Sequence, residues 1–216
     1  MSQQSTEPVE IDTPVGPARV QLAPAEGDRA RGLVALGHGA GGGVNARDLV
    51  AVTAALAAGG WSVARVEQPY RVRGRRFPDR APLLDEAWVS VVAAIRDRHP
   101  GPLVLGGRSS GGRVACRTAT TLGAAAVVCL AFPLRPPPRR PSQPPGPSRA
   151  AELAMVTVPL LVVQGERDPF GGPADFPPGP LVVAVPGDHA LRRTADVAAA
   201  VVRWLDDQGL DDQRLA

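Results

Sequence analysis

The sequence predicts an α/β protein built on a mostly parallel sheet with helices on both faces. Short apolar runs alternate with helical patterns from about residue 30 to the C-terminus, and such runs are typical of strands buried on both sides. Before them, "VEID" and "ARVQLAP" flank "TPVGP", which predicts an antiparallel hairpin at one sheet edge. The 216 residues suffice for one sizeable core, so we expect a single domain over residues 1–216.

Six core strands are expected after the hairpin, each a short apolar run that meets Gly or Pro close to its ends. Their sequences are "GLVALG" (32–37), "WSVARVE" (61–67), "PLVLGG" (102–107), "AAAVVCLAF" (124–132), "PLLVVQG" (159–165) and "PLVVAVPG" (180–187).

Amphipathic helices are expected between and after these strands. They cover residues 45–60, 81–99, 111–123 and 193–207. In the first of them, Asn45 is the expected N-cap and Gly59 the stop. The second is expected to have acids in its first turn and arginines in its last turn, as the helix dipole favours.

A proline-rich segment interrupts this alternation. Residues 132–149, "FPLRPPPRRPSQPPGPSR", hold eight prolines in eighteen positions, which excludes a helix or a central strand. Strands of the same series lie on both sides, so we expect a loop across the top of the sheet rather than a linker between domains.

The charge of the chain gives little reason to expect a nucleic-acid partner. The net charge is +3 and the pI about 9.6, but every basic residue is Arg, and arginines are scattered among 21 acidic residues. The densest basic stretch, "RVRGRR" (71–76), has no interleaved aromatic residues, which favours a solvated loop over an anion or partner contact.

No membrane partner, cofactor or metal is expected. The N-terminus has no signal-peptide pattern, and the longest apolar run, "AAAVVCLAF", is too short to span a bilayer, so we expect a soluble, cytoplasmic protein. Cys116 and Cys129 lie in apolar surroundings without metal-ligand spacing, which favours inert buried thiols.

Residues 107–111, "GRSSG", fit the pattern G-x-S-x-G directly between an expected strand and an expected helix. In that setting the chain turns so tightly that only glycines fit beside the serine, whose hydroxyl is then exposed at the carboxyl end of the sheet. Ser109 is therefore the candidate nucleophile, and Ser110 occupies the variable position. The alternative is a flexible glycine loop that happens to contain serine.

A nucleophilic serine needs a base and a group that orients the base. Of the three histidines, His189 in "VPGDHAL" follows the last expected strand, whereas His99 is the expected exposed end of a helix. Asp168 follows the preceding strand and completes the chain order Ser109, Asp168, His189 that is typical of α/β-hydrolases. Glu166 is the fallback orienting group, and Asp188 is a poor candidate because it directly precedes His189.

An acyl-transfer site also needs donors for a developing oxyanion. The loop "GHGAGGG" (37–43) lies between the first core strand and the first helix. We expect the backbone N–H of Gly39 or Ala40, together with that of Ser110, to form an oxyanion hole. A phosphate-binding loop is the competing interpretation, but no G-K-[ST] follows.

The ordered motifs "LGHGAGG", "PYRVRGRR", "GGRSSGGR", "FPLRPP", "VQGERDPFG" and "GDH" resemble the KANL3/Tex30-type α/β-hydrolase family, which is related to dienelactone hydrolases. The resemblance covers roughly residues 10–206. It implies an α/β-hydrolase fold and a site of Ser109, Asp168 and His189. The sequence itself has only the proline-rich loop between the strands expected at 124–132 and 159–165, so we expect no substantial lid domain and an open pocket. The turn that carries the nucleophile, called the nucleophile elbow, commonly reads G-G-K-S-M-G-G-R in this family. In this chain Arg108 stands in place of the Lys and Ser110 in place of the Met.

These observations predict a serine hydrolase that cleaves a carboxylic ester or thioester of a small or water-soluble substrate through an acyl-enzyme. Arg108 is a candidate for binding an anionic substrate, with an ion-paired structural role as the alternative. Two other functions stay open. One is a non-catalytic, hydrolase-like scaffold that uses the proline-rich segment or "RVRGRR" to bind a partner, and the other is an acyltransferase with the same triad. The sequence does not indicate an oligomeric state.

Overall fold

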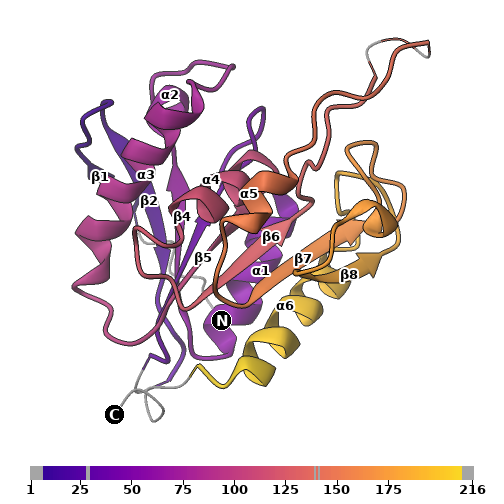
Figure 1. Ribbon diagram of the computed structural model, residues 1–216. Coiled ribbons are helices and arrows are strands. Elements are labelled where there is room, and N and C mark those ends of the chain that lie inside the picture. Colours follow the sequence, from indigo (N-terminus) through magenta and orange to yellow (C-terminus); the bar gives the residue numbers. More distant parts are fainter. Residues whose placement is uncertain (1–6, 28–29, 139, 141, 211–216) are drawn as a thin grey trace.

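The protein is described by a computed structural model over residues 7–27, 30–138, 140 and 142–210. In this part of the chain one eight-stranded sheet has the order β1-β2-β4-β3-β5-β6-β7-β8 (Figure 1). The strands are β1 Val9–Ile11, β2 Ala18–Ala23, β3 Leu33–Gly37, β4 Ser62–Glu67, β5 Leu103–Arg108, β6 Ala126–Leu130, β7 Leu160–Gly165 and β8 Leu181–Val185. The helices are α1 Arg47–Ala58, α2 Pro69–Val72, α3 Ala81–Arg96, α4 Ser110–Thr118, α5 Ala150–Ala154 and α6 Thr194–Gln208, with a 3-10 turn η1 at Pro173–Asp175.

The sheet confirms the fold class that the sequence predicts. β1 and β2 form the antiparallel edge hairpin, β2 pairs antiparallel with β4, and all later pairs are parallel. All six expected core strands are present, each within one or two residues of its expected start and end. Strands β3, β6 and β7 are buried along their whole length, which explains why their sequences are apolar without alternation.

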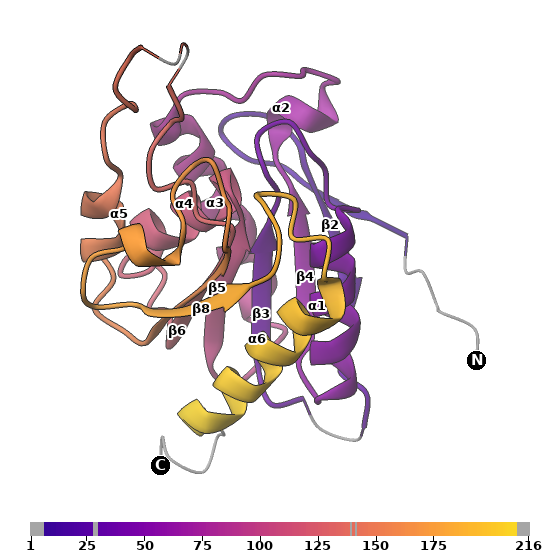
Figure 2. The same ribbon diagram turned by 90° about the vertical axis from the view of Figure 1, so that its right-hand side faces the viewer.

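Helices cover both faces of the sheet, as Figures 1 and 2 show together. Helices α1 and α6 lie side by side on one face, where Leu49, Val52, Val201 and Trp204 pack on the sheet. Helices α3, α4 and α5 cover the other face, with Trp88 of α3 completely buried. Each face thus has its own apolar core.

The sequence misses three short elements and misplaces one cap. Helices α2 and α5 and the turn η1 have only three to five residues each, too few for a periodic pattern. Helix α1 begins at Arg47 after Ala46, with no side-chain cap, so Asn45 is not the N-cap. The Asn45 amide oxygen instead accepts a hydrogen bond from Arg65. The first turn of α3 contains no acidic residue, contrary to expectation.

The strand order places the loops after β3 and β5 next to each other. The chain passes from β3 to β4 on one side and then crosses to β5 on the other. Such a switch point opens a crevice at the carboxyl ends of the strands, where α/β proteins hold their ligands.

The described part of the proline-rich segment 132–149 contains no helix or strand, and both views place it at the same end of the sheet as α2. No helix in the described ranges has the length and apolar character needed to cross a membrane.

Candidate active site

Ser109 sits on a strained turn between β5 and α4. Its backbone has φ 52° and ψ −109°, a conformation that L-residues rarely adopt and that costs about 1–3 kcal/mol. The turn is held because the Ser109 N–H donates to the carbonyl of Leu130 on β6, 2.8 Å away. The sharp turn expected from G-x-S-x-G is therefore present at Ser109.

Three glycines allow the start of α4 to approach β3 backbone to backbone. A Cβ on Gly107 would lie 2.5 Å from the carbonyl oxygen of Gly37, and a Cβ on Gly111 would overlap the same oxygen. No side chain fits at Gly107 or Gly111, which explains why the motif has glycine at both positions.

The side chains of Ser109, His189 and Asp168 form one hydrogen-bonded chain. The Oγ of Ser109 lies 3.0 Å from His189 Nε2, and His189 Nδ1 lies 2.8 Å from Asp168 Oδ2. The carboxylate only accepts, so Nδ1 carries the proton and the Nε2 lone pair faces the serine hydroxyl. Elements about 80 residues apart in sequence meet here, because β5, β7 and β8 end at the same edge of the sheet.

Asp168 is held by two further donors. Its side chain is fully buried, and it accepts hydrogen bonds from the Gln164 Nε2 at 2.9 Å and from the Phe170 N–H at 2.8 Å. The Phe170 ring also lies beside the His189 ring, with centroids 4.5 Å apart. Sequence reasoning missed Gln164, although a lone amide in the apolar run "LLVVQG" is a signal for a buried polar group that needs partners.

The other acidic and histidine candidates lie apart from this chain of hydrogen bonds. Glu166 is exposed, and the carboxylate of Asp188 accepts from the Ala190 N–H and from Arg192. His99 follows the end of α3 and is half-buried.

His38 fixes the glycine loop after β3. Its Nε2 accepts a hydrogen bond from the Gln68 N–H at 3.1 Å, so Nδ1 carries the proton and donates to the carbonyl of Gly39, 2.8 Å away. Because a trans peptide holds C=O and N–H on opposite sides, fixing this carbonyl also fixes the Ala40 N–H. Burial lowers the pKa of His38, which keeps the ring neutral.

Tyr70 on α2 holds the next peptide of the same loop. Its hydroxyl donates to the carbonyl of Ala40 at 2.9 Å, and burial raises the pKa of Tyr70 to about 12, so the donor proton stays in place. Ser110 is the first residue of α4, and its N–H belongs to the donors that a helix leaves free at its start. The peptide groups of Gly39 and Ala40 are therefore held in place, close to the N-terminus of α4, where helix N–H groups have no partner within the helix.

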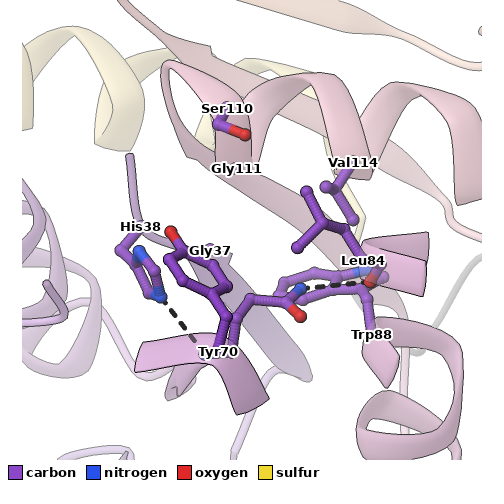
Figure 3. A pocket seen from close by; sticks show the side chains of 9 residues that line it. Gly37, His38, Tyr70, Leu84, Trp88, Ser110, Gly111 and Val114 are labelled. Carbon is purple, nitrogen blue, oxygen red and sulfur yellow. Dashed lines mark hydrogen bonds between the residues drawn. The ribbon is translucent and has the colours of Figure 1, made fainter. Parts of the chain in front are cut away.

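A cavity of about 10 Å³ lies between the end of β3, α2, α3 and the start of α4 (Figure 3). It is lined by Gly37, His38, Gln68, Tyr70, Leu84, Trp88, Ser110, Gly111 and Val114. Its size suits a single water molecule and no acyl chain. Gln68 Oε1 and Trp88 Nε1 are buried without a hydrogen-bond partner in the described structure, so the lining offers both an acceptor and a donor.

The arginines near the elbow are engaged with protein groups. Arg108 donates to the carboxylate of Asp48 and to the backbone carbonyl of His189, which favours the ion-paired structural role over substrate binding. Arg113 forms two hydrogen bonds to Glu152 on α5. In the basic stretch 71–76, Arg73 and Arg75 pair with Asp79.

The two cysteines are buried against each other, with Sγ atoms 3.5 Å apart. The hydrogen bond with Cys116, together with burial, raises the pKa of the Cys129 thiol, which disfavours the reactive thiolate. Across the described residues, no three His, Cys, Asp or Glu side chains gather as a metal ion would require.

Comparison with known proteins agrees with this architecture. Among solved structures, a serine hydrolase homologue from Coxiella burnetii superposes with a TM-score of 0.76 at 18% identity, covering 95% of this chain and 100% of that chain. A serine hydrolase without lid from Xanthomonas campestris gives 0.70 at 23% identity, covering 94% and 97%. A dienelactone hydrolase from Anabaena variabilis gives 0.71 at 19% identity, covering 95% and 99%.

No curated protein matches the sequence significantly. The model of the alpha/beta hydrolase domain family, in contrast, matches residues 30–194, a range that runs from just before β3 to the start of α6 and contains Ser109, Asp168 and His189. The chain therefore belongs to the alpha/beta hydrolase domain family.

Proposed function

We propose that the protein is a serine hydrolase that cleaves a carboxylic ester or thioester of a small or water-soluble substrate. One observation carries the proposal. A serine on a strained turn, a histidine with its free lone pair toward that serine, and a buried carboxylate are joined by hydrogen bonds of 3.0 and 2.8 Å. A protein that only binds partners has no physical need for this arrangement.

In the acylation step, Ser109 Oγ attacks the carbonyl carbon of the substrate while its proton passes to His189 Nε2. Asp168 stabilises the imidazolium that forms and keeps the ring in place. The protonated His189 then donates its proton to the leaving alcohol or thiol, the bond to that group breaks, and an acyl-serine remains.

The oxyanion of each tetrahedral intermediate is assigned to the backbone N–H groups of Ala40 and Ser110, with Gly39 as the alternative donor. His38 and Tyr70 hold the peptides of this loop, so the donors need little rearrangement when charge develops. In deacylation, water attacks the acyl carbon while His189 takes its proton. The bond between the acyl carbon and Ser109 Oγ then breaks, His189 returns the proton to Ser109 Oγ, and the acid is released. No step requires a cofactor.

The substrate class follows from what surrounds the site. Between β6 and α5, the described residues of the proline-rich segment form no helical lid over the site. The Xanthomonas neighbour is likewise described as lacking a lid. We therefore expect butyryl esters to be hydrolysed faster than palmitoyl esters; equal rates, or faster palmitoyl turnover, would exclude an open pocket for short acyl groups.

Within the wider hydrolase family, we place the chain near KANL3/Tex30-type proteins on the motifs that the sequence carries. Arg108 and Ser110 are its departures from the common elbow sequence. An acyltransferase would use the same triad, and competition between water and an added alcohol acceptor distinguishes the two activities.

Covalent labelling with a fluorophosphonate probe tests the proposal. The unmodified chain and Ser110→Ala should be labelled, and Ser109→Ala should not, because only an activated serine reacts with the probe. Ser110 is the matched control, since it is the adjacent serine. Absence of labelling in folded, unmodified protein would refute the proposal and favour the hydrolase-like scaffold, which partner capture would then test.

A further inference from the structure

Arg108 connects the turn that carries Ser109 to helix α1 and to the loop that carries His189. It is the last residue of β5 and directly precedes Ser109. Its side chain is largely buried, with 19% exposed. The Nε donates to Asp48 Oδ2 at 2.8 Å, and Nη2 donates to the backbone carbonyl of His189 at 2.9 Å. One planar guanidinium thus reaches two different elements at once.

Asp48 gives this guanidinium a fixed anchor. It lies in the first turn of α1, the helix that follows the glycine loop, and its side chain is only 2% exposed. Its second oxygen accepts the N–H of Leu49 at 2.9 Å. A Cβ on Gly39 would lie 3.1 Å from Arg108 Nη1, so the guanidinium also packs against the loop that carries the candidate oxyanion donors.

The second partner of Arg108 is the loop that carries His189. It connects β8 to α6 and is half-buried. Leu191, two residues after the histidine, has φ 44°, a strained value that persists only where surrounding contacts enforce it. The hydrogen bond from Arg108 holds the backbone of the histidine itself, whereas Ser109 and Asp168 contact its ring.

We propose that Arg108 is a positioning residue that sets the distance and angle of His189 relative to Ser109. This inference rests on the proposed hydrolase function. A guanidinium suits the task because it presents several N–H donors in a rigid plane, whereas a lysine ammonium is a compact point charge on a flexible stem. Lysine at this position retains the charge opposite Asp48 but does not fix both contacts in one geometry.

The test compares Arg108→Lys with Arg117→Lys. Arg117 is a matched control: it is a buried arginine on α4, 13% exposed, with a forked contact to Asp85 at 2.6 and 2.8 Å. Both substitutions remove a planar guanidinium that makes two hydrogen bonds, and both retain the positive charge. The readouts are kcat and KM for a butyryl ester, the rate of fluorophosphonate labelling, Tm, and amide exchange in residues 187–191.

Arg108→Lys should lower kcat and the labelling rate by about 10- to 100-fold with KM within about threefold, because a small misplacement of a catalytic group slows the chemical step more than binding. Amide exchange in 187–191 should become faster. Arg117→Lys should lower Tm while kcat stays within about twofold. If Arg108→Lys retains full kcat, or if both variants lose only stability, Arg108 has no positioning role.

Two outcomes need a further experiment: a variant that does not fold and a chain that shows no activity. If Arg108→Lys does not fold, the neutral pair Asp48→Asn with Arg108→Gln replaces it, since no buried charge is then left unpaired, and the same loss of kcat is expected. If the unmodified chain neither reacts with the probe nor hydrolyses esters, the proposed function fails. The exchange rates in 187–191 then still show whether Arg108 holds the histidine loop.

Discussion

Replacing Asp168 by Asn tests whether the buried carboxylate sets the protonation of His189. In the structure one carboxylate oxygen accepts from both His189 Nδ1 and Gln164 Nε2, at 2.8 and 2.9 Å, and the other accepts from the Phe170 N–H at 2.8 Å. All three contacts need an acceptor, and Asn offers one oxygen and one donor group.

The size of the effect follows from where the new amide NH₂ lies. Facing Phe170, it opposes a backbone donor, which costs about 1–3 kcal/mol for a buried unsatisfied group. Facing His189, it forces the other tautomer, so that Nε2 carries a proton toward Ser109 and is no longer a base. A triad in the wrong tautomer loses about 10⁴-fold in kcat, or about 5.5 kcal/mol in activation free energy.

The assay is the turnover of a butyryl ester together with the rate of fluorophosphonate labelling. Glu166→Gln is the matched control, because Glu166 is an exposed acid in the same loop. It should leave both rates within about twofold. Asp168→Asn with kcat within tenfold of the unmodified chain would refute the orienting role, and an equal loss in Glu166→Gln would point to a general effect of the loop.

Two further predictions concern the backbone approach at the elbow and the buried histidine. Gly111→Ala should abolish fluorophosphonate labelling or folding, because the new Cβ overlaps the Gly37 carbonyl oxygen. Gly43→Ala should retain both, because the space around its Cβ is open. A Gly111→Ala variant that is still labelled would contradict the close backbone packing. Burial lowers the pKa of His38 below its ordinary 6.5, so below pH 6.5 the unfolded chain binds a proton that the folded chain does not. The stabilising contribution of the neutral ring to the free energy of unfolding is therefore complete above pH 6.5. Below that pH it decreases by at most about 1.4 kcal/mol per pH unit. Thermal melts from pH 7.5 to 5.5 should therefore show a smaller pH dependence in His38→Gln, and an unchanged dependence would assign the effect to other groups.

Much of the fold and the placement of the elbow follow from local patterns. Apolar runs such as "LVALG" and "AVVCL" predict buried strands because both faces of a parallel sheet exclude water. The motif around Ser109 depends only on glycines within two residues of the serine, and the order Ser109, Asp168, His189 depends only on which strand each residue follows. Short elements such as α2 have too few residues to leave a pattern.

The sequence by itself therefore determined the parallel sheet, the glycine-flanked serine and the three residue types that follow β5, β7 and β8. Only the tertiary structure decided between Asp168 and Glu166, because burial selects the carboxylate and burial depends on how the loop packs after β7. It also revealed Gln164 and the contacts of Arg108 with Asp48 and with the backbone of His189, which favour a structural role for Arg108 over substrate binding. Such contacts join residues up to 81 positions apart, and they exist only once the strands are ordered and their ends meet.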